Sequence, residues 1–187
     1  MRQNSNKVLD ELLILRIKES DSKSLSLFVK RWHTKLIWYS HQTIHDDEEA
    51  KDIVQDSWQT ILHGIQNLQN PGSYKSWMYR VIRNKSIDRL REINRKNQVQ
   101  EQIMLESIPQ VEQDDNRESE LQIIAKLIQL LPFDLKEILQ LFYLETQSVE
   151  EIGSILSIPT GTVKSRLFRA RELLKKELMK AKKHIES

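Results

Sequence analysis

Residues 46–65 read DDEEAKDIVQDSWQTILHGI, and this stretch decides the fold. Apolar side chains recur at spacings of three and four from Ala50 to Ile65, which predicts one amphipathic helix. The carboxylates of Asp46 and Asp47 suit the start of such a helix, where the helix dipole is positive. The apolar face must therefore enter a hydrophobic core. The opposite face stays free for water or a partner, and it carries Lys51, Asp52, Gln55, Asp56 and Gln59.

Helical patterns continue on both sides of this stretch. Residues 8–19 carry leucine and isoleucine among charges, and Ser20-Asp21-Ser22 ends that helix and offers an N-cap to the next one. A second apolar stripe runs from Leu25 to Tyr39. After a turn at Asn70-Pro71-Gly72, a fourth helix is predicted from about Tyr74 to Arg95. Its buried side consists of Trp77, Met78, Val81 and Ile82.

The composition excludes several classes of protein. Hydrophobic residues make up 39% of the 187 residues and charged residues 30%, which is typical of a globular domain with a charged surface. Only 4 Gly and 4 Pro occur, which favours long helices over a β fold. The lack of Cys excludes disulfides and zinc–thiolate sites. We find no signal segment and no apolar run that could cross a membrane, so we expect a cytoplasmic protein without membrane insertion.

The net charge of +2 conceals a strong segregation of charge along the chain. Residues 75–96 contain eight basic and two acidic residues, and residues 160–187 contain nine basic and three acidic residues. Between these blocks, residues 98–120 contain seven acidic residues and one arginine. Two basic blocks around an acidic one indicate two modules that contact a polyanion, with a solvated tether between them.

The C-terminal part predicts a helix-turn-helix. Residues 121–131 predict one helix, which Pro132 ends, and residues 135–142 predict another. Ser148-Val149-Glu150-Glu151 then forms a capping box, which starts a short helix that buries its isoleucines. Ser157-Ile158-Pro159 makes a turn, and a longer basic helix begins at about Thr160. A short capped helix, a turn and a basic helix together predict this DNA-binding motif.

The last helix has an apolar face and a basic face. Because Val163, Leu167, Ala170 and Leu174 share the inward side, the outward side of its first half would enter the major groove. There an arginine can bind guanine through two hydrogen bonds, a serine can bond several base edges, and an aromatic ring can touch a thymine methyl. The candidate base-reading residues are Lys164, Ser165, Phe168 and Arg169, with Thr162, Arg166 and Arg171 as phosphate contacts.

Three motifs together resemble the extracytoplasmic-function (ECF) sigma factors of bacterial RNA polymerase. Residues 148–171 are similar to region 4 of that family, and residues 46–58 are similar to the region 2 helix that docks on the polymerase. Ser76-Trp77-Met78-Tyr79-Arg80-Val81-Ile82-Arg83-Asn84, with Ile87-Asp88-Arg89 and Arg91, resembles the adjoining segment that opens DNA. The motifs cover most of the chain in the family's order. The chain departs from the family pattern at Ser20, where Gly is common, at Met78, where Leu is usual, and at Thr160, where Val is common.

The resemblance implies an all-α fold with two small helical domains. Region 2 is expected over residues 1–97 as a helical bundle, an acidic flexible linker over 98–117, and region 4 with its helix-turn-helix over 118–187. The resemblance implies a protein that binds core RNA polymerase and promoter DNA and directs promoter-specific transcription initiation. It implies no catalytic residue and no cofactor. It also raises an anti-sigma factor as a partner, which the sequence does not identify.

The family's functional residues can be placed on matching positions. Asp52, Gln55 and Asp56 match the surface that binds the clamp helices of the largest polymerase subunits. The loop from about Gln66 to Ser73 matches the element that captures a flipped base of the minus-ten promoter element. The resemblance implies minus-ten contacts at Asn67, Asn70 and Ser73 and backbone contacts at Arg80, Arg83, Lys85, Arg89 and Arg91. For the minus-thirty-five element it implies Thr162, Lys164, Ser165, Arg166, Phe168, Arg169 and Arg171.

Two other functions remain open from the residues alone. A free-standing helix-turn-helix regulator would bind a duplex operator unaided, often as a dimer. An adaptor would use the face of Asp52, Gln55 and Asp56 to bind protein and would have no salt-dependent affinity for DNA. An enzyme is not expected, because the sequence has no phosphate loop, no nucleophile elbow and no zinc-protease motif. His41 and His45 have the spacing of a helical metal pair, but no third ligand is evident unless Asp46 serves, and we expect no metal.

Overall fold

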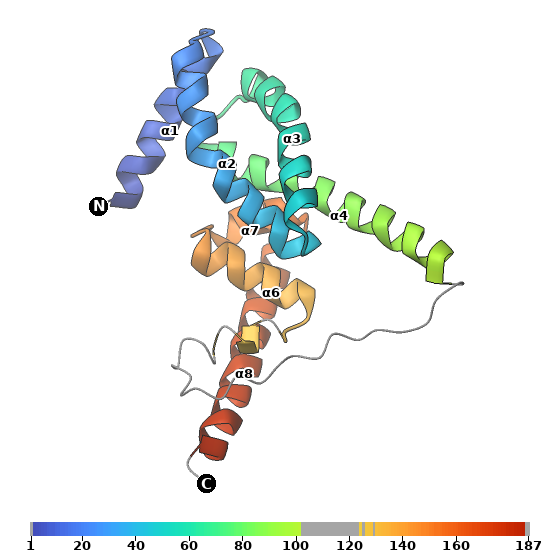
Figure 1. The fold of residues 1–187 in the computed structure, drawn as a ribbon. Helices are drawn as coiled ribbons and strands as arrows, with labels where there is room; N and C mark the ends of the chain where they lie inside the picture. The colour runs from blue at the N-terminus through green and yellow to red at the C-terminus, as the bar shows by residue number, and fades with distance from the viewer. Residues whose placement is uncertain (1, 102–123, 125, 129, 186–187) are drawn as a thin grey trace. The chain divides into compact units, whose positions relative to one another are not determined.

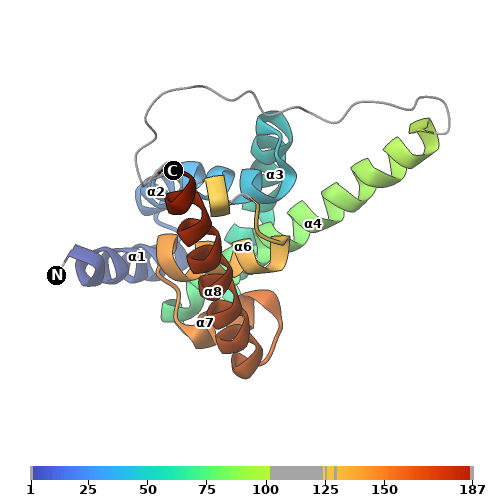
Figure 2. The ribbon, with the colours of Figure 1, turned by 90° about the horizontal axis from the view of Figure 1, so that it is seen from below.

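Every regular element in the described part of the chain is helical (Figures 1 and 2). The structure is a computed structural model that describes residues 2–101, 124, 126–128 and 130–185. Contacts divide the chain into two units, Met1–Glu106 and Ser107–Ser187, and each unit is considered by itself. The predicted all-α fold is confirmed.

The first unit contains α1 (Arg2–Lys18), α2 (Ser22–Ile44), α3 (Asp47–Asn67), the 3-10 turn η1 (Pro71–Ser73) and α4 (Tyr74–Glu101). The helix α2 packs against α1, α3 and α4, and α3 also packs against α4. In both views the C-terminal part of α4 extends beyond the other three helices (Figures 1 and 2). This helix continues past its predicted end at Arg95, because no Gly or Pro interrupts the following residues. Residues 98–101 are thus helical, and residues 102–117 of the predicted linker lie outside the described residues.

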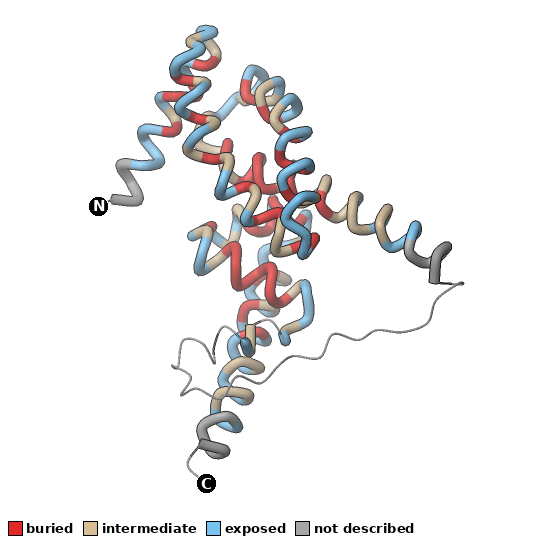
Figure 3. The backbone as a smooth tube through the Cα atoms, in the orientation of Figure 1, coloured by how far each residue is buried: buried red, intermediate tan, exposed pale blue. Residues whose placement is uncertain are grey.

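The helix α3 has the two faces that its sequence predicts (Figure 3). The side chains of Ala50, Val54, Ile61 and Ile65 are fully buried, and Ile53 is 6% exposed. The polar residues at positions 51, 52, 55, 56 and 59 are all exposed. Asp46 caps the helix, since its side chain accepts a hydrogen bond from the backbone N–H of Glu49 at 2.9 Å.

An aromatic cluster fills the space between α2 and α4. Phe28, Trp32 and Tyr39 of α2 meet Tyr74 and Tyr79 of α4, and all five rings are at most 3% exposed. Most of these pairs pack edge to face, with ring centroids 4.8 Å apart for Tyr39 and Tyr79 and 5.6 Å apart for Trp32 and Tyr74. Such pairs stabilise a core beyond the area that they bury. The sequence pattern had placed neither Tyr74 nor Tyr79 on the buried side of this helix.

The turn between α1 and α2 is a Schellman motif. The Asp21 N–H donates to the Arg16 carbonyl at 3.0 Å and the Ser20 N–H donates to the Ile17 carbonyl at 2.9 Å. Ser20 stands at the left-handed position of this motif, with φ of 66°. Glycine is favoured at such a position, which gives a physical reason for the Gly that the ECF family commonly has there. Asp21 then caps α2, and its hydrogen bond from the Ser24 hydroxyl lowers the pKa of the Asp21 carboxyl.

The second unit contains α6 (Phe133–Leu139), the π-helical turn η2 (Gln140–Leu144), α7 (Val149–Leu156) and α8 (Thr160–Ile185). Its buried apolar residues come from α6, η2, α7 and the first half of α8, which pack on one another. Residues 124 and 126–128 are helical, and the rest of the predicted helix over 121–131 is described only in part. The helix predicted over 135–142 is wrong at its end, since its last turn is π-helical and leaves Phe142 half-buried.

Gly64 of α3 lies directly under the indole ring of Trp77 on α4, so that a Cβ at position 64 would overlap the ring. We expect overpacking in Gly64→Ala to lower the free energy of unfolding by about 1–3 kcal/mol. The higher helix propensity of alanine should offset about 1 kcal/mol of this loss. All four tryptophans lie in the first unit, so urea unfolding followed by tryptophan fluorescence measures this effect. Gln59→Ala, at an exposed position of the same helix, is the control. A Gly64→Ala protein as stable as Gln59→Ala would contradict the packing.

Ser148 starts α7 with both hydrogen bonds of a capping box. Its hydroxyl accepts from the Glu151 N–H at 3.1 Å, and its own N–H donates to the Glu151 carboxylate at 2.7 Å. We expect Ser148→Ala to destabilise the second unit by about 1 kcal/mol. This loss should shift the urea transition of the second unit, followed by circular dichroism, to lower urea concentration. The transition of the first unit, followed by tryptophan fluorescence, should stay unchanged. Ser154→Ala, exposed in the same helix, should move neither, and equal shifts for both variants would refute the role of the cap.

Candidate protein and nucleic-acid interfaces

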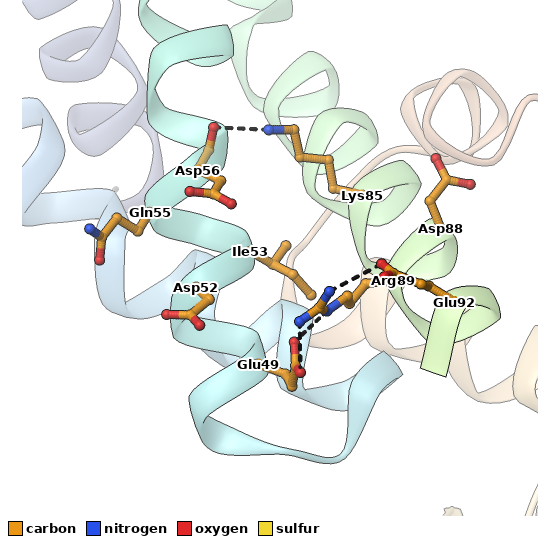
Figure 4. Close-up of a pocket in the computed structure, with 9 residues that line it drawn as sticks. All are labelled: Glu49, Asp52, Ile53, Gln55, Asp56, Lys85, Asp88, Arg89 and Glu92. Atoms are coloured by element: carbon orange, nitrogen blue, oxygen red, sulfur yellow. Dashed lines mark hydrogen bonds and ion pairs between the residues drawn. The ribbon is translucent and has the colours of Figure 1, made fainter. Parts of the chain in front are cut away.

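The exposed face of α3 borders a groove of about 530 Å³ between α3 and α4 (Figure 4). Asp52, Gln55 and Asp56 follow one another along α3 at its edge. Five carboxylates and only two cationic groups line the groove, so this surface is acidic. The three residues that the sequence predicts for polymerase binding are therefore brought together on one accessible face. The lining residues are Glu49, Asp52, Ile53, Gln55, Asp56, Lys85, Asp88, Arg89 and Glu92.

Arg89 joins α4 to α3 across this groove. Its guanidinium binds both carboxylate oxygens of Glu49, with Nε–Oε2 at 2.6 Å and Nη2–Oε1 at 2.9 Å, and also reaches Glu92 at 3.1 Å. These hydrogen bonds raise the pKa of Arg89. Lys85 likewise donates to the backbone carbonyl of Asp56 at 2.9 Å. Both residues thus contact α3, although the sequence placed them among the DNA contacts.

The basic block of α4 consequently divides between two sides of the helix. Residues three, four or eleven apart share a face of an α-helix, so that Arg80, Arg83 and Arg91 lie together. Lys85 and Arg89 lie on the side that meets α3. Arg91 is exposed and forms an ion pair with Asp88 at 3.2 Å. Of the five residues that the resemblance assigns to the DNA backbone, Arg80, Arg83 and Arg91 therefore share one side of α4, and the other two contact α3.

The loop between α3 and α4 is ordered by its own polar side chains. The Asn70 side chain accepts a hydrogen bond from the Gly72 N–H at 2.9 Å, and the Ser73 hydroxyl donates to the Asn70 carbonyl at 2.8 Å. Asn67 donates from its side chain to the His63 carbonyl at 3.1 Å. Asn67 and Asn70 are exposed and Ser73 is half-buried. Asn70 and Ser73 thus build the turn, Asn67 bonds within α3, and both asparagines face solvent.

A buried carboxylate that the sequence pattern did not predict lies beside this loop. Asp10 of α1 is only 3% exposed, and its two oxygens accept from Arg31 Nε at 2.8 Å and from the Tyr74 hydroxyl at 2.9 Å. Burial, and then the negative charge of Asp10, raise the pKa of Tyr74, which keeps the phenol protonated as a donor. The signal was present in the pattern, because Asp10 occupies the apolar stripe of Leu13 and Ile17.

The helix-turn-helix of the second unit has the predicted geometry. A left-handed residue, Ser157 with φ of 55°, ends α7. Gly153 packs closely on the turn, since a Cβ there would lie 3.0 Å from the Ile158 carbonyl oxygen. Val163, Leu167 and Ala170 of α8 are buried. The four predicted base-reading residues are all exposed, namely Lys164, Ser165, Phe168 and Arg169.

The three predicted phosphate contacts differ in their surroundings. Thr162 is half-buried, and Arg166 lies 3.5 Å from the Asp134 carboxylate with its side chain 34% exposed. Arg171 donates to the Tyr143 hydroxyl at 2.9 Å and stacks 5.5 Å from the centroids of both the Phe142 and Tyr143 rings. Arg171 thus fastens α8 to the π-helical turn η2.

The described residues contain neither a metal-binding cluster nor a membrane-spanning helix. Among the described residues, His, Asp and Glu form no group of three that could hold a metal ion. The His41 and His45 rings lie 6.2 Å apart at 88° to each other. No helix of the described ranges has the length and hydropathy needed to cross a membrane.

Two family models match the chain: "Sigma-70 region 2" over residues 28–96 and "Sigma-70, region 4" over residues 121–174. The RNA polymerase sigma factor SigV of Bacillus subtilis is 31% identical over 137 residues, which cover 73% of this chain and 80% of SigV. The ECF RNA polymerase sigma-E factor of Haemophilus influenzae is 28% identical over 186 residues, which cover 93% and 97%. The fold is similar to that of the sigma factor RpoE of Bartonella quintana, crystallised with the anti-sigma factor NepR. That similarity has a TM-score of 0.65 at 24% identity and covers 84% of this chain and 98% of RpoE.

Proposed function

The chain belongs to the sigma-70 family of bacterial RNA polymerase sigma factors, in its ECF group, and we propose how its two units divide the work of promoter-directed initiation. As a sigma factor it binds core RNA polymerase and directs transcription to promoters. The proposal assigns surfaces of the described residues to polymerase and to the two promoter elements. Region 2 would extend over residues 1–97, the linker over 98–117 and region 4 over 118–187, with α4 reaching into the start of the linker.

The exposed face of α3 would bind the clamp helices of the largest polymerase subunit. The observation that carries this assignment is the separation of the two faces of α3, since the apolar stripe is buried while Asp52, Gln55 and Asp56 are exposed together. Their carboxylates form part of an acidic groove, which suits a basic partner surface.

The loop after α3 and the outer side of α4 would hold the minus-ten element as a single strand. Asn67, Asn70 and Ser73 would face the extruded base, and Arg80, Arg83 and Arg91 would follow the phosphates. We assign Lys85 and Arg89 instead to the α3–α4 contact, because their donors already bind α3. The ordered turn at Asn70 supports this reading, since a pocket for one base must keep its shape.

The second unit would read the minus-thirty-five element in the major groove. Lys164, Ser165, Phe168 and Arg169 are exposed at the start of α8, where a recognition helix meets base edges. Thr162 and Arg166 flank them at positions suited to phosphates. Arg171 would act mainly through its contact with Tyr143, which sets the orientation of α8.

The polymerase would supply the catalysis, and this chain would act by binding alone, in the bacterial cytoplasm where the polymerase works. An anti-sigma factor is a further proposed partner, because the similar RpoE of Bartonella quintana was crystallised with one. Such an inhibitor would act by covering the α3 face or the recognition helix.

Run-off transcription with purified core polymerase tests the proposed function. A pool of barcoded templates with randomised upstream elements removes the need to know the promoter. We expect transcripts from a defined subset of templates only when both core enzyme and this protein are present. Tight operator binding by the free protein would favour the regulator, and polymerase binding without any template preference would favour the adaptor.

Reversal of charge on the α3 face should weaken the polymerase complex. We expect Asp52→Lys with Asp56→Lys to lower the affinity for core enzyme by about tenfold or more, since like charges at an interface repel. Folding should stay nearly intact, because both side chains are exposed. Glu19→Lys with Glu177→Lys makes the same change of net charge at residues outside α3 and should leave the affinity unchanged. An unfolded double variant on α3 would refute the assignment of its faces.

Removal of the Arg169 guanidinium should relax recognition at one or two upstream base pairs. We expect Arg169→Ala to reduce discrimination there by about 1–3 kcal/mol, measured as template preference in the randomised pool. Lys176→Ala, two turns further along the same exposed side of α8, should weaken binding evenly across template sequences and lower the dependence of binding on salt. If Arg169→Ala also weakened binding equally on all template sequences, this residue would bind phosphate and not a base.

A further inference from the structure

The helix α1 lies against the loop that precedes α4, and nothing in the proposed function uses this helix. At the first end of the loop, Lys18 of α1 donates to the Leu68 carbonyl, and the Gln66 side chain donates to the Ile17 carbonyl at 3.1 Å. Near its other end, Gly72 faces Glu11, because a Cβ on Gly72 would lie 3.2 Å from the Glu11 carboxylate. The helix α1 therefore contacts the loop near both of its ends.

At the second end of the loop, the buried carboxylate of Asp10 fixes Tyr74. Tyr74 is the residue that follows η1, and it is 3% exposed. Its hydroxyl donates to Asp10 at 2.9 Å, while its ring packs on Phe28 and Trp32 with centroids 6.1 and 5.6 Å apart. A ring that packs on two other rings and is held at its hydroxyl leaves the adjoining backbone little freedom.

A buried carboxylate is retained at a high desolvation cost unless its oxygens are paired. Both oxygens of Asp10 are paired, one with Arg31 of α2 and the other with Tyr74 of α4. Neither partner lies on α1 itself, so the group connects three helices at the point where the loop ends. An apolar residue at this position of the stripe would avoid the desolvation cost, but it could not orient the hydroxyl of Tyr74.

We propose that α1 sets the conformation of the loop over residues 66–73, and that Asp10 is a positioning residue for minus-ten recognition through Tyr74. Asp10 is buried and acts without touching DNA. The inference rests on the proposed function, in which this loop captures a base. It adds a determinant of promoter specificity outside every motif of the sequence, on a helix with no other assigned role.

Tyr74→Phe removes the hydroxyl that binds Asp10 and keeps the ring. Ser86→Ala is the matched control, since its hydroxyl forms a buried hydrogen bond with Ser40 at 2.9 Å in the same unit, between α2 and α4. Each variant loses one buried hydrogen bond, so both should lose similar stability. We expect hydrogen exchange at the Gly72 and Ser73 amides to rise about tenfold in Tyr74→Phe and to stay near the wild-type rate in Ser86→Ala.

The template pool provides the second readout with the full-length protein and core enzyme. Tyr74→Phe should reduce the preference among minus-ten bases about five- to tenfold, with core affinity and minus-thirty-five preference unchanged. The preference of Asp10→Asn among minus-ten bases should lie between those of wild type and Tyr74→Phe, because the amide oxygen of the asparagine can still accept a hydrogen bond from the tyrosine.

Two results would overturn the inference while the proposed function stands. One is a wild-type protein that selects minus-ten bases together with a Tyr74→Phe variant that selects them equally well. The other is an equal effect of Tyr74→Phe and Ser86→Ala on hydrogen exchange in the loop and on base preference. That result would mean that Asp10 contributes only to the general stability of the first unit. A wild-type protein without any minus-ten preference would instead remove the function of the loop, and with it the inference.

Discussion

The apolar stripe of α3 is buried against α2 and α4, and this burial fixes the rotation of α3 about its own axis. Ile53 and Ala50 pack with Ile44 of α2 and with Leu90 and Ile93 of α4. Because side chains on a helix cannot turn independently of its backbone, the same rotation exposes Asp52 and Asp56. The face proposed to bind polymerase is thus a direct result of how the core is packed. No separate structural element is needed to present it.

Arginines that look equivalent in the sequence have different surroundings in the structure. Arg89 lies among the basic residues of α4, yet it binds Glu49 of α3 through two hydrogen bonds. Arg171 lies among the basic residues of α8, yet it stacks on Phe142 and Tyr143. An exposed ion pair adds little stability, but a bidentate or stacked guanidinium fixes direction. We infer that these two residues orient the helices that carry the proposed DNA contacts.

The sequence predicted what depends on local pattern and missed what depends on distant partners. Helix faces, the start of α3 near Asp46 and the capping box at Ser148 follow from local sequence, so they were predicted correctly. The bond between Asp10 and Tyr74 joins residues far apart in the chain, and no local rule contains it. The division of the basic block on α4 likewise depends on where α3 lies. The π-helical turn at residues 140–144 has no sequence signature that we recognise.

The serine at the turn between α1 and α2 has a consequence for how this chain can change during evolution. A left-handed backbone costs a non-glycine residue about 1–2 kcal/mol, whereas a glycine there would lose about 0.5–1 kcal/mol more chain entropy on folding. The second term offsets only part of the first, which leaves a preference for glycine of at most about 1.5 kcal/mol. Serine at position 20 is therefore tolerated at a small loss of stability, and a change to glycine there needs no compensating substitution elsewhere.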